Sequence, residues 1–316
     1  MYILLFALVF GTGALLIFQG SVRRSRARLW SGGLLLLAGL TLLVLMAFWA
    51  EMLWYRALEF EHRFWRFVWA RINAVLFGAA LAGSLSLLLT RGAGVQLRRG
   101  ATALAVAAGV LWGSAYWQQI LLFINGVATT TADPLLGFNT GFYLFTLPVL
   151  DGLFWLLGVV SLLVLLAVLC FRAEHSVARL PGAFLVPAER LLIPGASLAL
   201  AVTLAYGQLL AVCHLLYSEL GVVQGPGWTD VHVRLPALML MAGVFIVAGA
   251  LPLFAGFRAF MTQLVRRWSV TLPANLVATT GAWALIGTLW IVLILAIPTL
   301  VQWMVVKPNE ITFESP

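Results

Sequence analysis

Eight long apolar stretches, separated by short polar loops, dominate this sequence. Each has about the 20 apolar residues that a helix needs to cross a bilayer. Their approximate bounds are 2–18, 29–50, 68–89, 102–126, 149–171, 196–218, 236–256 and 277–299. Backbone polar groups inside a bilayer must be satisfied within the protein, which favours helices over open sheet. The sequence therefore predicts an all-α, polytopic membrane helix bundle of about eight transmembrane helices, forming a single transmembrane domain over residues 1–316.

The composition supports a membrane protein and argues against nucleic-acid binding. Only 9% of the 316 residues are charged, against roughly 25% in soluble domains. The net charge of +8 comes from basic residues that lie mostly between the apolar stretches, where membrane topology places them. Cys170 and Cys213 lie in apolar stretches and lack the CxxC spacing of a zinc site. We expect membrane lipids and other membrane protein subunits as partners, and no nucleic acid.

The basic residues alternate between successive loops. Thirteen of the 19 basic residues follow the odd-numbered stretches, and they are Arg23, Arg24, Arg26, Arg28, Arg91, Arg98, Arg99, Arg172, Arg179, Arg190, Arg258, Arg266 and Arg267. Loops rich in Lys and Arg face the cytoplasm. The pattern therefore predicts both termini on the non-cytoplasmic side. The first stretch has no positive charge before it, which predicts an uncleaved helix rather than a secretory signal.

Residues 51–71 combine aromatic and charged side chains. Trp54 and Tyr55 suit the boundary between membrane and water. Glu59 and Arg63 are spaced to pair on one helix face. We interpret this segment as an interfacial helix that leads into the third span.

A second outer segment, residues 127–148, interrupts the chain near its middle. Its glycines and prolines argue against one continuous helix, and they are Pro134, Gly137, Gly141 and Pro148. Its aromatic residues make it too apolar for a free loop. We expect it to pack onto the helices or to dip into the membrane as a re-entrant piece. Because Asp133 is its only acid, a packing or docking surface is favoured over a reaction centre.

Small and polar residues mark faces of two spans. Ala79 and Gly83 are four residues apart in the third span, which favours close helix packing there. Ser114, Gln118 and Asn125 lie close to one face of the fourth span. Such polar side chains either bond to neighbouring helices or line a solute path. The sequence leaves both alternatives open.

Two ionisable residues stand out in or near spans. His214 is the only histidine inside a predicted span. It could pack through a hydrogen bond, relay protons, or bind a porphyrin-type cofactor through a ring nitrogen. Asp151 opens the fifth span from outside, where a helix N-terminus favours negative charge, so we expect it to cap that helix.

Enzyme motifs are absent from the sequence. There is no Gly-x-Ser-x-Gly elbow, P-loop or GxGxxG fingerprint. Glu59-x-x-His62 has the spacing of half a di-iron site, but no second copy exists. We therefore predict no catalytic residues and no metal site, and the identity of any cofactor stays open.

Four outer-side motifs resemble the uncharacterised bacterial transmembrane protein family UPF0182. They are Leu53-Trp54-Tyr55-Arg56-Ala57-Leu58, Phe142-Tyr143-Leu144-Phe145-Thr146-Leu147-Pro148, Trp228-Thr229-Asp230-Val231-His232-Val233-Arg234-Leu235-Pro236 and Val306-Lys307-Pro308-Asn309-Glu310. Their order and spacing also fit, and the resemblance covers essentially the whole chain. It implies a multi-pass protein of the bacterial cytoplasmic (inner) membrane with no assigned function. The residues it marks for interaction or structure are Trp54, Tyr55, Phe142, Tyr143, Pro148, Trp228, Asp230, Pro308, Asn309 and Glu310.

The resemblance also implies a large extracytoplasmic domain after the Pro-Asn-Glu motif. On that basis we interpret the chain as a naturally short relative or a fragment. Asn139 stands where the family tends to have an acid, which argues against a cation site there. Trp228 stands where the family tends to have tyrosine.

Three functions are compatible with these observations. The favoured one is an integral membrane structural or accessory subunit that docks to a larger membrane complex. The alternative is a transporter or channel for an unidentified solute, lined by the polar face of the fourth span and by His214. A more distant alternative is a membrane protein that binds a cofactor through His214, and an enzyme is least favoured.

Overall fold

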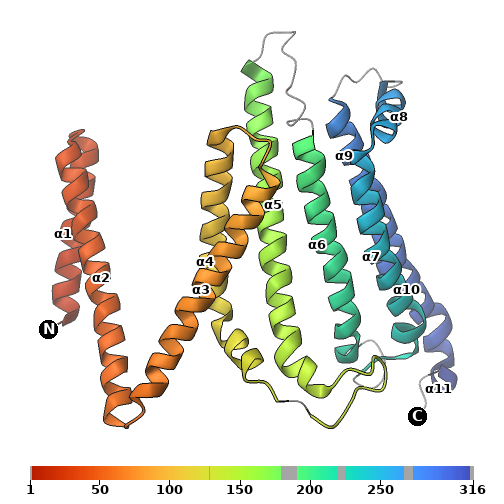
Figure 1. The fold of residues 1–316 in the computed structure, drawn as a ribbon, viewed down its shortest axis with the longest axis horizontal. Coiled ribbons are helices and arrows are strands. Elements are labelled where there is room, and N and C mark those ends of the chain that lie inside the picture. The colour runs from red at the N-terminus through yellow and green to blue at the C-terminus, as the bar shows by residue number, and fades with distance from the viewer. Residues whose placement is uncertain (1, 128, 179–190, 220–224, 267–272, 314–316) are drawn as a thin grey trace. The chain divides into compact units, whose positions relative to one another are not determined.

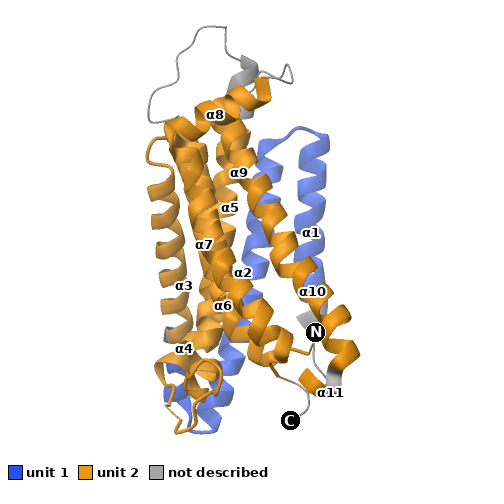
Figure 2. Ribbon diagram, turned by 90° about the vertical axis from the view of Figure 1, so that its right-hand side faces the viewer, with its two compact units in different colours: residues 1–69 blue, residues 70–316 orange. Residues whose placement is uncertain are grey.

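The structure, a computed structural model, describes residues 2–127, 129–178, 191–219, 225–266 and 273–313. These residues form helices and no strand, apart from an isolated antiparallel bridge between Ala132 and Asn139. They fall into two compact units, residues 1–69 and 70–316 (Figure 2). Seven helical segments of the described chain are long and apolar enough to cross a membrane. The prediction of an all-α, polytopic helix bundle is confirmed.

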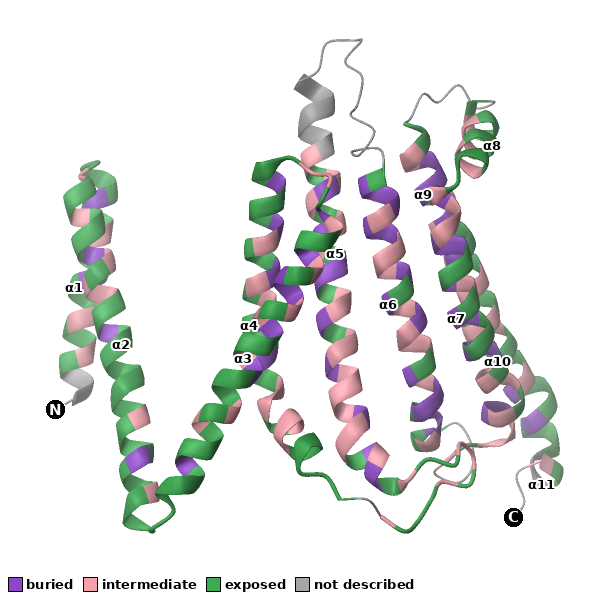
Figure 3. Cartoon of the chain, in the orientation of Figure 1, coloured by how far each residue is buried: buried purple, intermediate pink, exposed green. Residues whose placement is uncertain are grey.

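Unit 1 contains α1 (Tyr2–Val22), α2 (Arg26–Ala57) and the first residues of α3 (Glu61–Leu89). α1 and α2 form a hairpin in which a Cβ on Gly32 would overlap Ile17 and the backbone of Gly13. Most side chains of α2 are exposed (Figure 3). A helix that is apolar all round is expected in a core or a membrane, and this one has little protein around it.

The interfacial helix predicted over residues 51–71 is not a separate element. α2 continues to Ala57, and α3 begins at Glu61. Between them Glu59 has a φ of 62°, the left-handed conformation that commonly ends a helix. Glu59 therefore lies in a turn and shares no helix face with Arg63, whose guanidinium carbon lies 4.9 Å from the ring centroid of Phe60. The prediction was wrong because no glycine marked this helix end.

Unit 2 contains the remaining helices (Figure 1). They are the rest of α3, then α4 (Val95–Ile124), α5 (Leu147–Ala178), α6 (Leu192–His214), α7 (Leu235–Ala250), α8 (Ala255–Arg266), α9 (Ala274–Trp290), α10 (Ile297–Val301) and α11 (Glu310–Phe313). α4, α5, α6, α7 and α9 contact one another in that order. α4 is 30 residues long and corresponds to the fourth predicted span. It is not among the seven segments above, in keeping with its more polar sequence.

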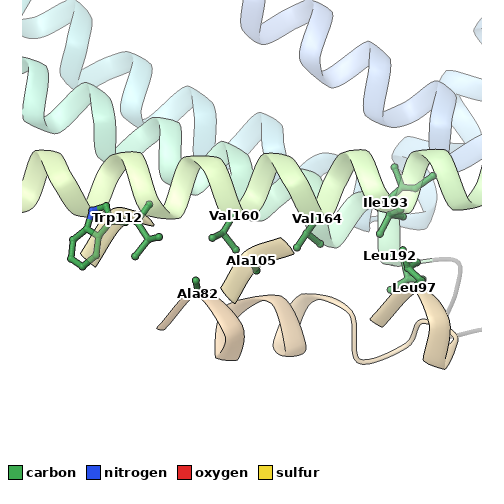
Figure 4. Close-up of a cluster of buried hydrophobic side chains, with 11 residues drawn as sticks. Ala82, Leu97, Ala105, Trp112, Val160, Val164, Leu192 and Ile193 are labelled. Atoms are coloured by element: carbon green, nitrogen blue, oxygen red, sulfur yellow. The ribbon is translucent and has the colours of Figure 1, made fainter. Parts of the chain in front are cut away.

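A core of apolar side chains lies between α3, α4, α5 and α6 (Figure 4). α5 contributes a row at every fourth residue, in which Val160, Val164 and Val168 are fully buried. That spacing places the row on one helix face. Ala82, Ala105 and other small residues face it from α3 and α4, so these helices pack closely against α5.

α3 and α4 cross through glycine, at and beside the predicted residues. A Cβ on Gly109 would overlap the backbone of Gly78, and a Cβ on Gly113 would overlap the backbone of Ala74. The predicted pair also faces α4: a Cβ on Gly109 would lie 2.8 Å from Cα of Ala79, and a Cβ on Gly83 would lie 3.0 Å from the Val106 side chain. The sequence indicated one pair of small residues on α3, and the crossing also uses Ala74 and Gly78.

Four π-helical turns in the described part of unit 2 each precede a proline. They are η1 (Phe142–Thr146), η4 (Asp230–Arg234), η6 (Ile291–Ala296) and η7 (Gln302–Val306), followed by Pro148, Pro236, Pro298 and Pro308. Proline cannot donate to the carbonyl four residues back, and its ring crowds that carbonyl. A widened turn accommodates the ring without ending the helix. The segment 127–148 is therefore non-helical only in its first part, and from Thr140 it runs into α5.

Candidate functional site

The two ends of unit 2 differ in construction. At one end lie three connecting segments, residues 125–146, 215–234 and 302–313, which we call the loop end (Figure 1). At the other end lie residues 89–99 and 251–266, which we call the arginine end. The described residues of the arginine end include Arg91, Arg98, Arg99, Arg258 and Arg266, and no acid.

Asp133 fixes the first segment of the loop end. Its carboxylate accepts hydrogen bonds from the backbone N–H of Leu135 at 3.0 Å and of Leu136 at 2.7 Å. The Tyr143 hydroxyl donates to Oδ2 at 3.0 Å. Burial acts to raise the pKa of Asp133, but the three donors outweigh it and hold the pKa below its ordinary value. The group is ionised at neutral pH and ties the loop to the start of the fifth span.

Asn139 closes the same segment through both ends of its amide. Its Oδ1 accepts from the Thr129 N–H at 3.1 Å, the Thr129 hydroxyl at 2.6 Å and the Gly141 N–H at 2.7 Å. Its amide nitrogen donates to the Thr129 carbonyl. An ionised carboxylate at this position could accept hydrogen bonds but could not make that donation. The amide therefore has a structural role in this chain.

Apolar side chains of residues 125–146 pack against the helices of unit 2. Tyr143 and Leu136 pack in a cluster with Leu210 and Cys213 of α6. Leu136 also reaches a second cluster with residues near the start of α7. The rings of Phe138 and Phe142 stack with centroids 4.7 Å apart. The segment is thus packed against the bundle, as one of the two sequence-based alternatives proposed.

Asp230 is the most deeply buried charge described at the loop end. It has no exposed surface, and its Oδ1 lies 2.6 Å from the Arg234 guanidinium. Its Oδ2 accepts from the Gly227 N–H at 3.2 Å, while Arg234 also donates to the Ser218 hydroxyl at 3.4 Å. A buried ion pair is tolerated when further hydrogen bonds satisfy its polar atoms. These bonds fix the connection between α6 and α7.

The third segment joins the second through Thr229. Its hydroxyl donates to Oε1 of Gln302, and both side chains are buried. Nearby, the Trp228 ring stacks on His232 at 4.6 Å and contacts Phe313 of α11 at 4.9 Å. The segments 215–234 and 302–313, which are far apart in the sequence, are therefore in direct contact at the loop end.

The Pro-Asn-Glu motif forms a helical turn in that third segment. Pro308 and Asn309 lie in a 3-10 turn, and Glu310 begins α11. The Asn309 side-chain amide donates to the Val305 carbonyl at 3.0 Å. Beside the motif, the Lys307 ammonium lies 3.6 Å from the ring centroid of Trp303.

His214 and Asp151 form a pair across α5 and α6. Nε2 of His214 lies 2.9 Å from Oδ1 of Asp151, and the side chains are 46% and 32% exposed. Asp151 lies inside α5, which begins at Leu147 and continues from a π-helical turn. The predicted capping role is therefore wrong, because helix N–H groups near Asp151 already have partners. Among the described residues no three His, Cys, Asp or Glu side chains are grouped to hold a metal ion.

Two of the three residues on the predicted polar face of α4 donate hydrogen bonds to backbone carbonyls of the same helix. The Ser114 hydroxyl donates to the Leu111 carbonyl at 2.8 Å, and the Asn125 amide donates to the Leu121 carbonyl at 2.7 Å. Gln118 is exposed. These bonds satisfy polar groups locally and do not by themselves link the three residues into a path.

Two predicted interaction residues, Trp54 and Tyr55, belong to unit 1. Trp54 is 59% exposed, and its ring lies 5.1 Å from that of Tyr55. Tyr55 in turn contacts Phe64 at the start of α3, with centroids 5.7 Å apart. The two residues stabilise the turn between α2 and α3.

Sequence reasoning missed several residues of the loop end. Arg234, Thr229 and Gln302 complete its buried bonds, yet only the first carried a recognisable signal. Asp230 and Arg234 are four residues apart, which is the spacing of a helical ion pair. Nothing in the sequence indicates that Thr229 meets Gln302, because 73 residues separate them.

The fold and the loop end define a multi-span, α-helical membrane protein. A model of the "Uncharacterised protein family (UPF0182)" matches residues 87–316. The chain therefore belongs to the UPF0182 family.

Pairwise similarity to individual family members covers more of the chain than the family model does. A UPF0182 protein of Synechococcus sp. (strain JA-3-3Ab) is 34% identical over 298 residues, which cover 90% of this chain and 34% of the relative. One from Synechococcus sp. (strain JA-2-3B'a(2-13)) is 34% identical over 307 residues, covering 90% of this chain and 35% of the relative. This chain thus spans about a third of the length of these relatives. No solved structure matches it.

Proposed function

We propose that this chain is an integral membrane structural or accessory subunit that docks to a larger membrane complex through its loop end. The observation that supports this most is the ion pair of the buried Asp230 with the partly exposed Arg234, together with its bonds to Gly227 and Ser218. A connection between two spans needs no buried charge for insertion. Bonds of this kind hold a surface in one shape, which a docking site requires.

The side chains that the loop end presents suit a protein interface. Tyr217 is 60% exposed and Phe138 is 43% exposed. Large aromatic residues contribute most to interface cores, and tyrosine is among the commonest hot-spot residues. The Phe138 ring stacks on Phe142, and the Tyr217 ring contacts Tyr143 with centroids 6.5 Å apart. These contacts restrain both side chains, so little side-chain entropy is lost on binding.

The partner that best fits this surface is a water-soluble domain of the larger complex. The family relatives are about three times as long as the region they share with this chain. The sequence resemblance implies that they continue into an extracytoplasmic domain after the Pro-Asn-Glu motif. That motif precedes α11, whose Phe313 packs on Trp228 at the loop end. A domain of that kind, whichever chain carries it, would lie beside this surface.

Site-specific photo-crosslinking in native membranes tests this proposal. We would place a benzophenone amino acid at Phe138 or Tyr217, and as a control at Met239, an exposed residue of α7. We expect the same partner protein to be crosslinked from both loop-end positions, through a domain outside the membrane, and to copurify with the chain. We expect no crosslink to that protein from Met239. The docking proposal would be overturned if the probes formed adducts with lipid only and the purified protein were a monodisperse homomer that transports a solute in liposomes.

A transporter or channel is the second candidate function, supported by one observation. Within the described residues, three buried oxygen atoms have no hydrogen-bond partner, and they are Gln119 Oε1, Ser161 Oγ and Gln208 Oε1. They come from α4, α5 and α6, and an unpaired polar atom in a membrane protein favours a hydrated path. Gln208→Leu separates the two functions. Loss of a measured solute flux at unchanged stability would support transport, whereas no flux in either protein would support the structural subunit.

A further inference from the structure

α8 is a short helix whose surface divides into three sectors. Phe257, Met261 and Val265 follow each other at four-residue spacing and are half-buried. Phe260 and Leu264 form the adjacent stripe and are 60% and 44% exposed. The rest of the surface is polar or small and exposed for the most part, with Ala259, Gln263 and Arg266 among its residues.

The half-buried sector is the one that contacts the bundle. A Cβ on Gly281 of α9 would overlap the end of the Met261 side chain, so the two helices are in close contact. Arg258 donates from one guanidinium nitrogen to the carbonyls of Pro252 at 2.9 Å and Leu253 at 2.6 Å. These carbonyls end the helical segment that includes α7, and their bonds hold α8 across the end of the bundle (Figure 2).

The exposed apolar stripe needs a further partner. No residue of α8 is buried, and an apolar stripe beside a polar face is the pattern of a helix that lies in a membrane interface. α8 follows the span that ends at Leu253 and precedes the one that begins at Ala274, so it lies where the bilayer surface must be.

The positive charge of α8 and of the surrounding arginine end favours contact with anionic lipid. α8 has two arginines and no acid, and Arg91, Arg98 and Arg99 lie at the same end of unit 2. Arg258 is occupied by backbone carbonyls, whereas Arg266 is exposed. A basic residue near an anionic membrane surface attracts its headgroups.

We propose that α8 is an in-plane helix that inserts Phe260 and Leu264 into the bilayer interface and gathers anionic phospholipid through Arg266. The proposal is independent of the docking function, which concerns the loop end. The bilayer then contacts the apolar stripe and Arg266, while α9 contacts the adjacent half-buried sector through Met261.

Spin-label accessibility on the full-length protein tests the insertion. With Cys170 and Cys213 replaced by alanine, single labels would be placed at Phe260, Leu264, Ala259 and Gln263. In nanodiscs we expect greater collision with oxygen at the first two positions and with a water-soluble nickel chelate at the last two. Nickel-accessible labels at Phe260 and Leu264 would overturn insertion. Labels inaccessible to both reagents there would also overturn it, in favour of a covering protein.

Lipid selectivity tests the charge. Nanodiscs would hold equal amounts of phosphatidylcholine and phosphatidylglycerol, and the lipids retained by the protein would be measured by native mass spectrometry. We expect Arg266→Gln to lower phosphatidylglycerol preference about fivefold, the effect of about 1 kcal/mol per basic residue at an anionic surface. Arg266→Lys should retain the preference, and Gln263→Ala serves as the matched control. An unchanged preference in Arg266→Gln would overturn the anionic-lipid assignment.

Discussion

The loop end and the arginine end of unit 2 stabilise their connections by different means. At the loop end, side chains bond to one another, as in the Asp230–Arg234 and Asp133–Tyr143 pairs. At the arginine end, Arg258 bonds to backbone carbonyls, while Arg98, Arg99 and Arg266 are exposed. The loop end therefore has an internally determined shape, whereas the arginine end depends more on its surroundings. Substituting an arginine at each end, and comparing the losses in stability, should test this difference.

The largest expected effect is at the buried ion pair. Arg234→Met leaves the buried Asp230 carboxylate with the Gly227 N–H donor but without its charged partner. Removing one member of a buried pair costs about 3 kcal/mol or more. Thermal unfolding of the purified protein in detergent should show a clear fall in Tm.

A matched pair of controls sharpens this prediction. Arg266→Gln, at the arginine end, should change the free energy of unfolding by less than about 0.5 kcal/mol in the same detergent. Asp230→Asn combined with Arg234→Met should recover part of the loss, because no isolated charge then remains. Equal losses from Arg234→Met and Arg266→Gln would show that the two ends do not differ.

The next effect is at Tyr143. Tyr143→Phe removes the donor to Asp133 and retains the ring, which should cost about 1.5 kcal/mol as a hydrogen bond to a charged group. Tyr143→Ala and Phe142→Ala should cost more, because packing with Phe138 and α6 is also lost. We expect impaired assembly or stability in these variants. Normal assembly with loss of a transport activity would contradict the docking function.

The Asp133 carboxylate should make this stabilisation depend on pH. Because the pKa of Asp133 is lowered in the folded protein, its contribution is fully present above the ordinary value of 3.8. The contribution is lost as pH falls through the folded pKa. Unfolding measured against pH should therefore show an acid-side loss that Asp133→Asn lacks. Identical acid profiles in the two proteins would contradict the role of these hydrogen bonds.

Much of the fold could be predicted from sequence because spans are set by composition and length. The predicted stretches 2–18 and 68–89 lie within α1 and α3, for example. Boundaries were less accurate where proline was involved. Pro148 was expected to belong to a segment without one continuous helix, but a π-helical turn accommodates it in a helix that runs from Thr140 into α5. Sequence rules for soluble helices do not anticipate this.

The candidate site was only partly accessible to sequence reasoning. Motifs indicated Tyr143 and Asp230 as structural residues, whereas their partners depend on the fold. His214 and Asp151 were considered separately, and their pairing across 63 residues requires that α5 and α6 are neighbours. α8 was not predicted, because its 12 residues are too short and too mixed to stand out among spans. Three of the arginines on which the predicted topology rests, Arg179, Arg190 and Arg267, lie outside the described residues.

A smaller effect is expected at His214. Its pair with Asp151 is nearly half exposed on the histidine side, so His214→Leu should cost between about 0 and 1 kcal/mol. Absorption spectra of the purified wild-type and variant proteins provide a second measurement. An unchanged spectrum and activity would remove the cofactor and proton-relay hypotheses, while loss of a visible absorption band would establish His214 as a cofactor ligand.

The smallest effect on stability should come from Arg98 and Arg99, which are exposed at the arginine end. Replacing both with glutamine should alter the free energy of unfolding by no more than about 0.5 kcal/mol. Their role in orienting the spans should nevertheless show in living cells, because basic loops face the cytoplasm. A topology reporter inserted at residues 90–94 should read cytoplasmic in the parent and less uniformly so in the variant. A reporter that reads non-cytoplasmic in the parent would reverse the predicted orientation and place the loop end in the cytoplasm.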